Sequence, residues 1–142
     1  MGLVLDASVT MAWLVDRVET VEAQLADEVL RTIQAGGAQV PALWFAEVAN
    51  GVLVAERRGG VGRSTSASFM GLVNSLPIME DRTRPSDGQS MVLTLARAHG
   101  LTGYDATYLE LVLRTGGVLA TFDRQLAEAA RTAGARVFGD PA

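Results

Sequence analysis

The sequence predicts an α/β fold in three layers, with a central parallel sheet of about five strands and helices on both faces. Short apolar segments alternate with helical patterns along the whole chain. The composition agrees with sheets covered on both faces, since hydrophobic residues make up 49% and charged residues 20% of the chain. A chain of 142 residues suits one domain with a full core, so residues 1–142 are expected to form a single domain.

The predicted strands are short apolar runs that end at glycine, proline or a polar residue. They cover residues 3–5, 38–40, 76–79, 118–121 and 136–138. The first run suits a strand that is buried on both faces, so we expect it in the middle of the sheet. Pro41 ends the second strand, and Pro77 makes the third the weakest prediction. The last strand is expected at an edge.

The predicted helices follow from apolar residues at helical spacing and from their end signals. They cover residues 7–14, 19–35, 43–57, 64–75, 86–98, 102–115 and 123–132. We expect Ser64 to cap the fourth helix, and Ser86 with Gln89 to form a capping box at the fifth. Thr102 and Asp123 are expected to open the last two helices.

The helix predicted at residues 43–57 is apolar almost all round, so it should be covered on more than one side. Glu47 and Asn50 are three residues apart and share its narrow polar face. Gly51 beside them costs about 1 kcal/mol relative to alanine, unless another group approaches closely there.

The basic residues exclude several kinds of chemistry, because all 12 are arginines. Without lysine the chain cannot build a P-loop or a Schiff base. It has no cysteine and a single histidine, His99, so thiolate and histidine-rich metal sites are excluded as well.

The net charge of −4 argues against nonspecific attraction to nucleic acid, although two bound divalent cations would neutralise it. The N-terminus lacks a charged leader before an apolar run, and no stretch of about 18 apolar residues occurs. We therefore expect a cytoplasmic protein that does not associate with membranes.

Four carboxylates lie at predicted strand ends, near helix starts or within an apolar helix, where a functional role has to be weighed against a structural one. Asp6 and Asp123 follow predicted strands and precede helices, and Asp105 stands near the start of a helix. Each of these three could simply cap its helix. Glu47 has no cap to serve, and burial without a partner would be costly, so its structural explanation is an ion pair with an arginine.

The combination favours a functional site over four separate structural roles. The carboxyl ends of parallel strands meet at one edge of a sheet, where open α/β folds bind their ligands. Two carboxylates about 4 Å apart repel each other by about 4 kcal/mol at an effective dielectric near 20, so a converging group needs protons or cations. Hard oxygen ligands favour Mg²⁺ or Mn²⁺.

The chain also resembles PIN-domain nucleases, most closely the VapC-type toxins of prokaryotic toxin–antitoxin pairs. The resemblance lies in four short motifs in order: Leu5-Asp6-Ala7-Ser8, Glu47-Val48-Ala49-Asn50, Tyr104-Asp105-Ala106 and Thr121-Phe122-Asp123. It implies a metal-dependent endoribonuclease that is inhibited by a small cognate antitoxin and is commonly dimeric. The four acidic residues match the metal-site positions, and Ser8 and Thr121 match nearby hydroxyl positions.

Divalent ions would activate a nucleophile and stabilise charge on the phosphodiester oxygens. Asp6 and Asp105 are the first choices as direct ligands, whereas Asp123 could ligate a second ion or act through water. Glu47 could bind metal through water or orient the attacking water.

Other residues have weaker functional interpretations. Arg82 and Arg84 lie in a loop that leaves a predicted strand, so they are candidates for RNA phosphate contacts, although solvated surface charge is the stronger explanation for them. Trp44, Phe45, Phe69 and Met70 could line an antitoxin groove or pack in the core.

Two alternatives to the endoribonuclease remain at this point. One is a catalytically silent PIN-like scaffold that binds RNA or protein, which a full set of four like charges disfavours. The other is a metal-dependent phosphatase or DNA nuclease that uses the same site.

Overall fold

The computed structural model describes residues 2–141 and contains one parallel sheet. Its strands are β1 (Leu3–Leu5), β2 (Ala38–Val40), β3 (Ile78–Glu80), β4 (Val118–Ala120) and β5 (Arg136–Val137). They lie in the order β3-β2-β1-β4-β5, so β1 is central and β5 is at an edge, as predicted. Val4 and Leu5 are fully buried, which explains why the first strand is apolar without alternation.

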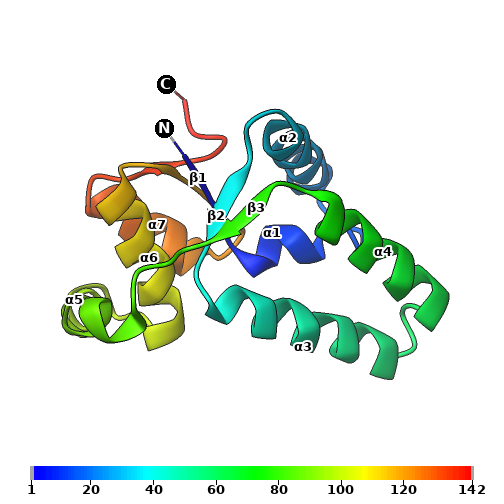
Figure 1. Ribbon diagram of the computed structural model, residues 1–142. Helices are drawn as coiled ribbons and strands as arrows, with labels where there is room; N and C mark the ends of the chain where they lie inside the picture. The colour runs from blue at the N-terminus through cyan, green and yellow to red at the C-terminus, as the bar shows by residue number, and fades with distance from the viewer. Residues whose placement is uncertain (1, 142) are drawn as a thin grey trace.

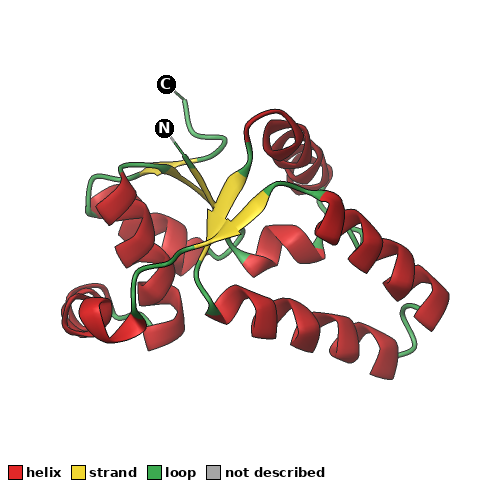
Figure 2. Cartoon of the chain, viewed as in Figure 1, coloured by secondary structure: helices red, strands yellow, loops and turns green. Residues whose placement is uncertain are grey.

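Helices fill every connection between the strands. They are α1 (Ala7–Met11), α2 (Thr20–Gly36), α3 (Leu43–Arg57), α4 (Arg63–Ser75), α5 (Pro85–His99), α6 (Gly103–Thr115) and α7 (Arg124–Thr132). The chain moves outward from β1 to β3 and then returns past β1 to β4 and β5. With right-handed crossovers, this reversal puts α1–α4 on one face of the sheet and α5–α7 on the other. Figures 1 and 2 show the resulting three layers, with α3 and α4 extending side by side away from the sheet.

Most helix ends agree with the prediction to within one residue, but the first helix is shorter and two predicted caps are absent. The first helix ends at Met11 and continues only as a turn. Ser64 lies inside α4, whose N-cap is Gly62. Ser86 lies inside α5, where Pro85 occupies the first turn and Arg84 is the N-cap, so the predicted capping box is absent. Proline at the first helical position lacks only an N–H that the helix does not use, so it sets the start of α5.

Two predicted caps are confirmed. The side chain of Thr102 accepts a hydrogen bond from the backbone N–H of Asp105 at 3.1 Å, at the start of α6. The side chain of Asp123 accepts one from the N–H of Leu126 at 2.8 Å, at the start of α7.

The expectation that α3 is covered on more than one side holds in part, since α1 and α4 both pack against it but an apolar stripe stays exposed. One face is buried through Trp44, Val48, Val52 and Ala55. Phe45, Ala49 and Leu53, four residues apart, form an exposed apolar stripe beside it, with Phe45 49% and Leu53 43% exposed. The apolar excess of α3 therefore lies partly at the surface.

Gly51 of α3 has a clear structural reason. A Cβ atom placed there would lie 2.6 Å from Sδ of Met11 and 2.8 Å from its Cε. Glycine therefore allows α1 to pack closely against α3, directly behind the strand end that carries Asp6.

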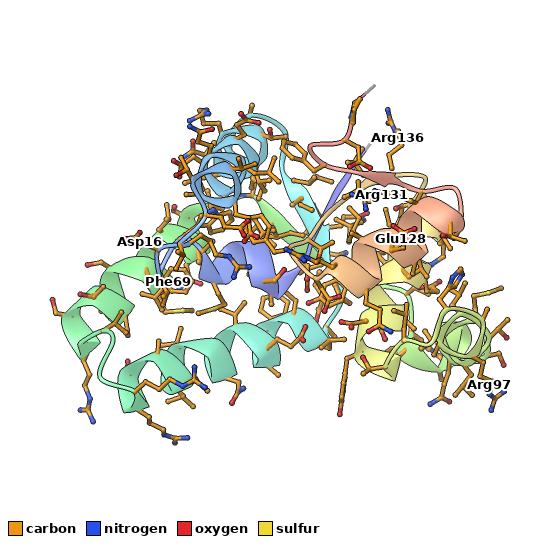
Figure 3. All side chains as sticks on the ribbon, turned by 180° about the vertical axis from the view of Figure 1, so that it is seen from behind. Asp16, Phe69, Arg97, Glu128, Arg131 and Arg136 are labelled. Carbon is orange, nitrogen blue, oxygen red and sulfur yellow. The ribbon has the colours of Figure 1, made fainter. Side chains whose placement is uncertain are left out.

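The C-terminal segment is tied to α7 by an ion pair. Arg131 lies 2.8 Å from Asp140 and 3.7 Å from Glu128, and Figure 3 shows Arg131 and Glu128 on the same helix. Within residues 2–141, no helix is long and apolar enough to cross a membrane.

Candidate metal centre at the carboxyl edge of the sheet

Asp6 lies directly after β1, next to the end of β4. The two strands pair in parallel with Leu5 opposite Ala120, and the N–H of Asp6 continues the ladder to the carbonyl of Ala120 at 3.0 Å. This bond places Asp6 beside Thr121, the first residue after β4. The pairing of two buried strands therefore fixes the backbone on both sides of the site.

The carboxylate of Asp6 is held by two hydroxyl groups. Ser8 Oγ and Thr121 Oγ1 each donate a 2.6 Å hydrogen bond to Asp6 Oδ2. Asp6 is the N-cap of α1 but makes no capping bond with its side chain, so the purely structural explanation for this residue does not apply. Burial raises the pKa of Asp6, the nearby charge of Asp123 adds to the increase, and the two hydroxyl donors oppose it.

The loop between β4 and α7 is fixed by the same hydroxyl groups. The N–H of Phe122 donates to Ser8 Oγ at 3.0 Å, and the N–H of Asp123 donates to Thr121 Oγ1 at 3.0 Å. Asp123 therefore has a double role, because it caps α7 with Oδ1 and also lies close enough to Asp6 to affect its pKa. The cap and the functional interpretation of Asp123 are compatible.

Glu47 is the acidic residue that α3 contributes to the site. Its Oε1 accepts a 2.5 Å hydrogen bond from the hydroxyl group of Tyr108 in α6, and it forms no ion pair with any arginine among residues 2–141. Burial raises the pKa of Glu47, the Tyr108 bond opposes this, and the charges of Asp6 and Asp105 raise it further. The predicted structural alternative, an arginine partner, is therefore wrong.

Asp105 lies in the first turn of α6, where Thr102 caps the helix. Partial burial and the charges of Asp123 and Asp6 raise its pKa to about 6, well above the usual value of 3.8. The charges of Asp123 and Asp6 thus act on the pKa of Asp105, and the charges of Asp6 and Asp105 act on the pKa of Glu47. The four predicted carboxylates therefore share one region at the carboxyl edge of the sheet.

The four carboxylates are spaced rather than tightly clustered. In the part of the chain that the structure describes, no group of three or more acidic or histidine side chains is already arranged to hold a metal ion. Their oxygen chemistry and mutual repulsion nevertheless suit a hard divalent cation. Mg²⁺ usually keeps several waters and uses only one or two carboxylates directly, so a spaced set is compatible with it.

The remaining predicted site residues lie at the periphery. Asn50 is exposed on α3, one turn after Glu47, and makes no hydrogen bond within residues 2–141. Arg82 and Arg84 are exposed in the connection after β3, whose carboxyl end faces the same edge as Asp6. Arg114 of α6 holds this connection through Asp81, with a shortest N–O distance of 2.6 Å.

The predicted groove residues differ in their exposure. Phe69 is 4% exposed and belongs to the core, whereas Trp44 is 2% exposed and also lines a pocket between α3, α4 and β3. Phe45 and Met70 line this apolar pocket of about 160 Å³, together with Asn74. The pocket lies on the face formed by α1–α4.

Two contacts were not expected from the sequence. Tyr108 stands three residues after Asp105, on the same face of α6, and this spacing is the signal that could have identified it. Arg17, between α1 and α2, places its guanidinium 4.5 Å from the centre of the Phe122 ring. No local pattern links Arg17 to a loop so far along the chain.

Comparison with known proteins gives concordant results. A family model described as PIN domain matches residues 3–132. Ribonuclease VapC3 of Pyrobaculum aerophilum is 59% identical over 34 residues, which are 24% of this chain and 26% of that protein. This similarity spans about a quarter of either protein.

Two crystal structures have the same fold over nearly the whole chain. PAE2754 from Pyrobaculum aerophilum has a TM-score of 0.69 and 25% identity, and the match covers 97% of this chain and 84% of that one. FitAcB from Neisseria gonorrhoeae has a TM-score of 0.64 and 17% identity, with 96% of each chain covered. The second likeness concerns the fold alone.

Proposed function

The chain belongs to the PIN domain family, and from this premise we propose that it is a Mg²⁺- or Mn²⁺-dependent endoribonuclease that hydrolyses RNA phosphodiester bonds. One observation carries the proposal: burial raises the pKa values of Asp6, Glu47 and Asp105 at the carboxyl edge of the sheet, and the charges of neighbouring carboxylates raise each of them further. Such repulsion destabilises the fold unless a cation or protons relieve it. We further propose that residues 1–142 act as one nuclease domain in the cytoplasm, as the toxin of a toxin–antitoxin pair.

The donor set fits a hard divalent cation, because it consists of carboxylate oxygens with hydroxyl groups behind them. Asp6 and Asp105 would hold the ion directly, and Asp123 would hold it directly or through water. When bound, the ion would lower the pKa of a water nucleophile and stabilise charge on the phosphate oxygens.

The protein's own groups would orient the reactants around this ion. Ser8 and Thr121 fix Asp6 by donating to Oδ2, so this ligand does not have to reorganise during the reaction. Glu47 has a raised pKa and would accept a hydrogen bond from the attacking water and so orient it. Asn50 would contact the substrate next to Glu47.

RNA would lie across the carboxyl edge of the sheet. Arg82 and Arg84 are exposed on the loop after β3 at that edge, and neither forms an ion pair within residues 2–141. They would contact backbone phosphates on one side of the cleavage site. The Arg114–Asp81 ion pair would hold this loop in place.

The partners follow from exposed apolar surface. The stripe of Phe45, Ala49 and Leu53 on α3 would be covered by a second copy of the chain in a homodimer. The nearby pocket lined by Phe45 and Met70 would take an apolar side chain of the antitoxin.

The decisive experiment is RNA cleavage by the protein purified free of any partner. We expect cleavage with Mg²⁺ or Mn²⁺, none in chelator, and none from Asp6→Asn or Asp105→Asn proteins that melt cooperatively. Arg97→Gln is a matched surface control, since Arg97 is exposed on the outer side of α5 (Figure 3). This variant should cleave RNA like the wild type. Unchanged cleavage in chelator or by both aspartate variants would overturn the proposal.

The same assay separates the other functions. RNA, single-stranded and duplex DNA, and a phosphomonoester are offered at equal concentration. Turnover of DNA or the monoester in preference to RNA would point to the alternative hydrolase. Absence of both cleavage and Mn²⁺ binding would point to the silent scaffold.

A further inference from the structure

Tyr108 connects the two helices that carry Asp105 and Glu47. It lies in α6, three residues after Asp105, so both side chains project from the same face of the helix. Its hydroxyl group donates to Oε1 of Glu47 at 2.5 Å, and this bond spans 61 residues of sequence. No other hydrogen bond holds the carboxylate of Glu47 within residues 2–141.

The hydroxyl group of Tyr108 lies in buried surroundings, where a polar group needs a hydrogen-bond partner. The residue is fully buried, and leaving its hydroxyl group without a partner would cost about 1–3 kcal/mol. A phenylalanine would fill the same space without that cost. The hydroxyl group points toward the acidic edge, because it donates to Glu47 there. Tyr108 therefore acts as a donor toward Glu47.

Glu47 needs such a donor more than its neighbours do. Asp6 is held by two hydroxyl groups and Asp123 caps α7, whereas Glu47 has a longer, more flexible side chain and is repelled by Asp6 and Asp105. Without the bond from Tyr108, rotation of Glu47 toward solvent would relieve this repulsion. A single charge-assisted O–H···O bond, which is short and strong, opposes that rotation.

From this geometry we propose that Tyr108 is a positioning residue that anchors Oε1 of Glu47 and so holds this carboxylate at the metal centre. The inference rests on the proposed function and makes it more specific. Glu47 then takes part in a fixed orientation, either on the ion or on a metal-bound water. Groups that orient metal-site carboxylates in this way typically contribute 10- to 100-fold to metal affinity or activity.

The test is calorimetric titration of the whole chain with Mn²⁺, combined with RNA cleavage kinetics. Tyr108→Phe removes one oxygen atom and keeps the ring. We expect Mn²⁺ affinity to fall by about 10-fold or more, and kcat to fall while KM for RNA changes little. Tyr104→Phe is the matched control, since Tyr104 lies on the same helix but is 69% exposed, and it should keep the Mn²⁺ affinity of the wild type.

A double-mutant cycle separates positioning from simple structural support. Tyr108→Phe should cause no further loss of Mn²⁺ affinity when Glu47 is already Gln, because the role of Tyr108 passes through Glu47. Equal losses in both backgrounds, or unchanged Mn²⁺ affinity together with a lower Tm, would overturn the inference. Wild-type protein that binds no Mn²⁺ at all would instead contradict the proposed function.

Discussion

The hydroxyl group of Thr121 donates a 2.6 Å hydrogen bond to Oδ2 of Asp6, although the two residues are 115 positions apart in the sequence. The same oxygen of Thr121 accepts the N–H of Asp123 at 3.0 Å. Thr121 therefore couples the orientation of Asp6 to the start of the loop that carries Asp123. Its side chain is an organising group of the site and does not itself need to bind a metal ion.

Thr121→Val should reduce both stability and activity. Valine keeps the shape of threonine but leaves Asp6 with one hydroxyl donor and the N–H of Asp123 without its acceptor. We expect a loss of roughly 1–3 kcal/mol in the free energy of unfolding, measured with urea. Cleavage should fall by about 10-fold or more, because the orientation of a metal ligand is loosened.

Thr94→Val provides the control for this substitution. Thr94 lies on exposed α5, and its hydroxyl group donates only to the carbonyl of Ser90 in the same helix. Its replacement should leave cleavage unchanged. Equal effects of the two valine substitutions on cleavage would contradict the organising role of Thr121.

The raised pKa of Asp105 predicts an unusual dependence of stability on pH. Its pKa is about 6 in the folded chain, against an ordinary value of 3.8 for aspartate. Between these values the folded state binds more protons than the unfolded state, so this residue makes the metal-free protein less stable as pH rises from about 4 to 6. Above pH 6 the effect is constant, and below pH 4 it vanishes.

Thermal melts of the wild type and Asp105→Asn in chelator isolate this contribution. The Tm of the variant should exceed that of the wild type at pH 7, and the difference should shrink as pH falls to 4. Adding Mn²⁺ at pH 7 should raise the Tm of the wild type more than that of the variant, since the ion relieves the repulsion. A difference independent of pH would show that the pKa of Asp105 is not raised in the folded chain.

The fold and the convergence of the four acidic residues could be predicted because both depend on local patterns. An apolar run that stops at a carboxylate marks the end of a buried strand, and parallel strands bring such ends together. Asp6 and Asp123 were recognised in this way, and the caps at Thr102 and Asp123 followed from their own short motifs.

The contacts that could not be predicted depend on tertiary packing. The Tyr108–Glu47 bond joins two helices on opposite faces of the sheet, and nothing near either residue indicates the other. The caps expected at Ser64 and Ser86 are absent for a different reason. Both helices start before these serines, at Arg63 and Pro85, so the serines lie inside the helices. Pro85 set the start of α5 one residue earlier than the serine signal indicated.

The close approach of Met11 to Gly51 predicts a coupling between α1 and α3. In a Met11→Ala background, Gly51→Ala should stabilise the protein by about 1 kcal/mol, through the helix propensity of alanine. In the wild type the gain should be smaller or reversed, because the new Cβ would lie 2.6 Å from Met11 Sδ. Urea unfolding of the single and double variants measures the coupling energy.

Gly71→Ala tests the same helix propensity without the contact. Gly71 lies in α4, and a Cβ atom there would have no neighbour within 4 Å. It should gain about 1 kcal/mol in either background. Identical gains from Gly51→Ala with and without Met11 would show that the side chain moves aside at no cost.

The exposed stripe on α3 predicts how the chain self-associates. Phe45, Ala49 and Leu53 form an apolar surface that the chain itself leaves uncovered, and a second copy would bury it. Leu53→Glu puts a charge into that interface and should convert a dimer to a monomer in analytical ultracentrifugation. Val21→Glu, on the solvent side of α2, adds the same charge to a 75% exposed position and should leave the dimer intact. Wild-type protein that sediments as a monomer, or a dimer that tolerates glutamate at position 53, would show that α3 does not form the interface.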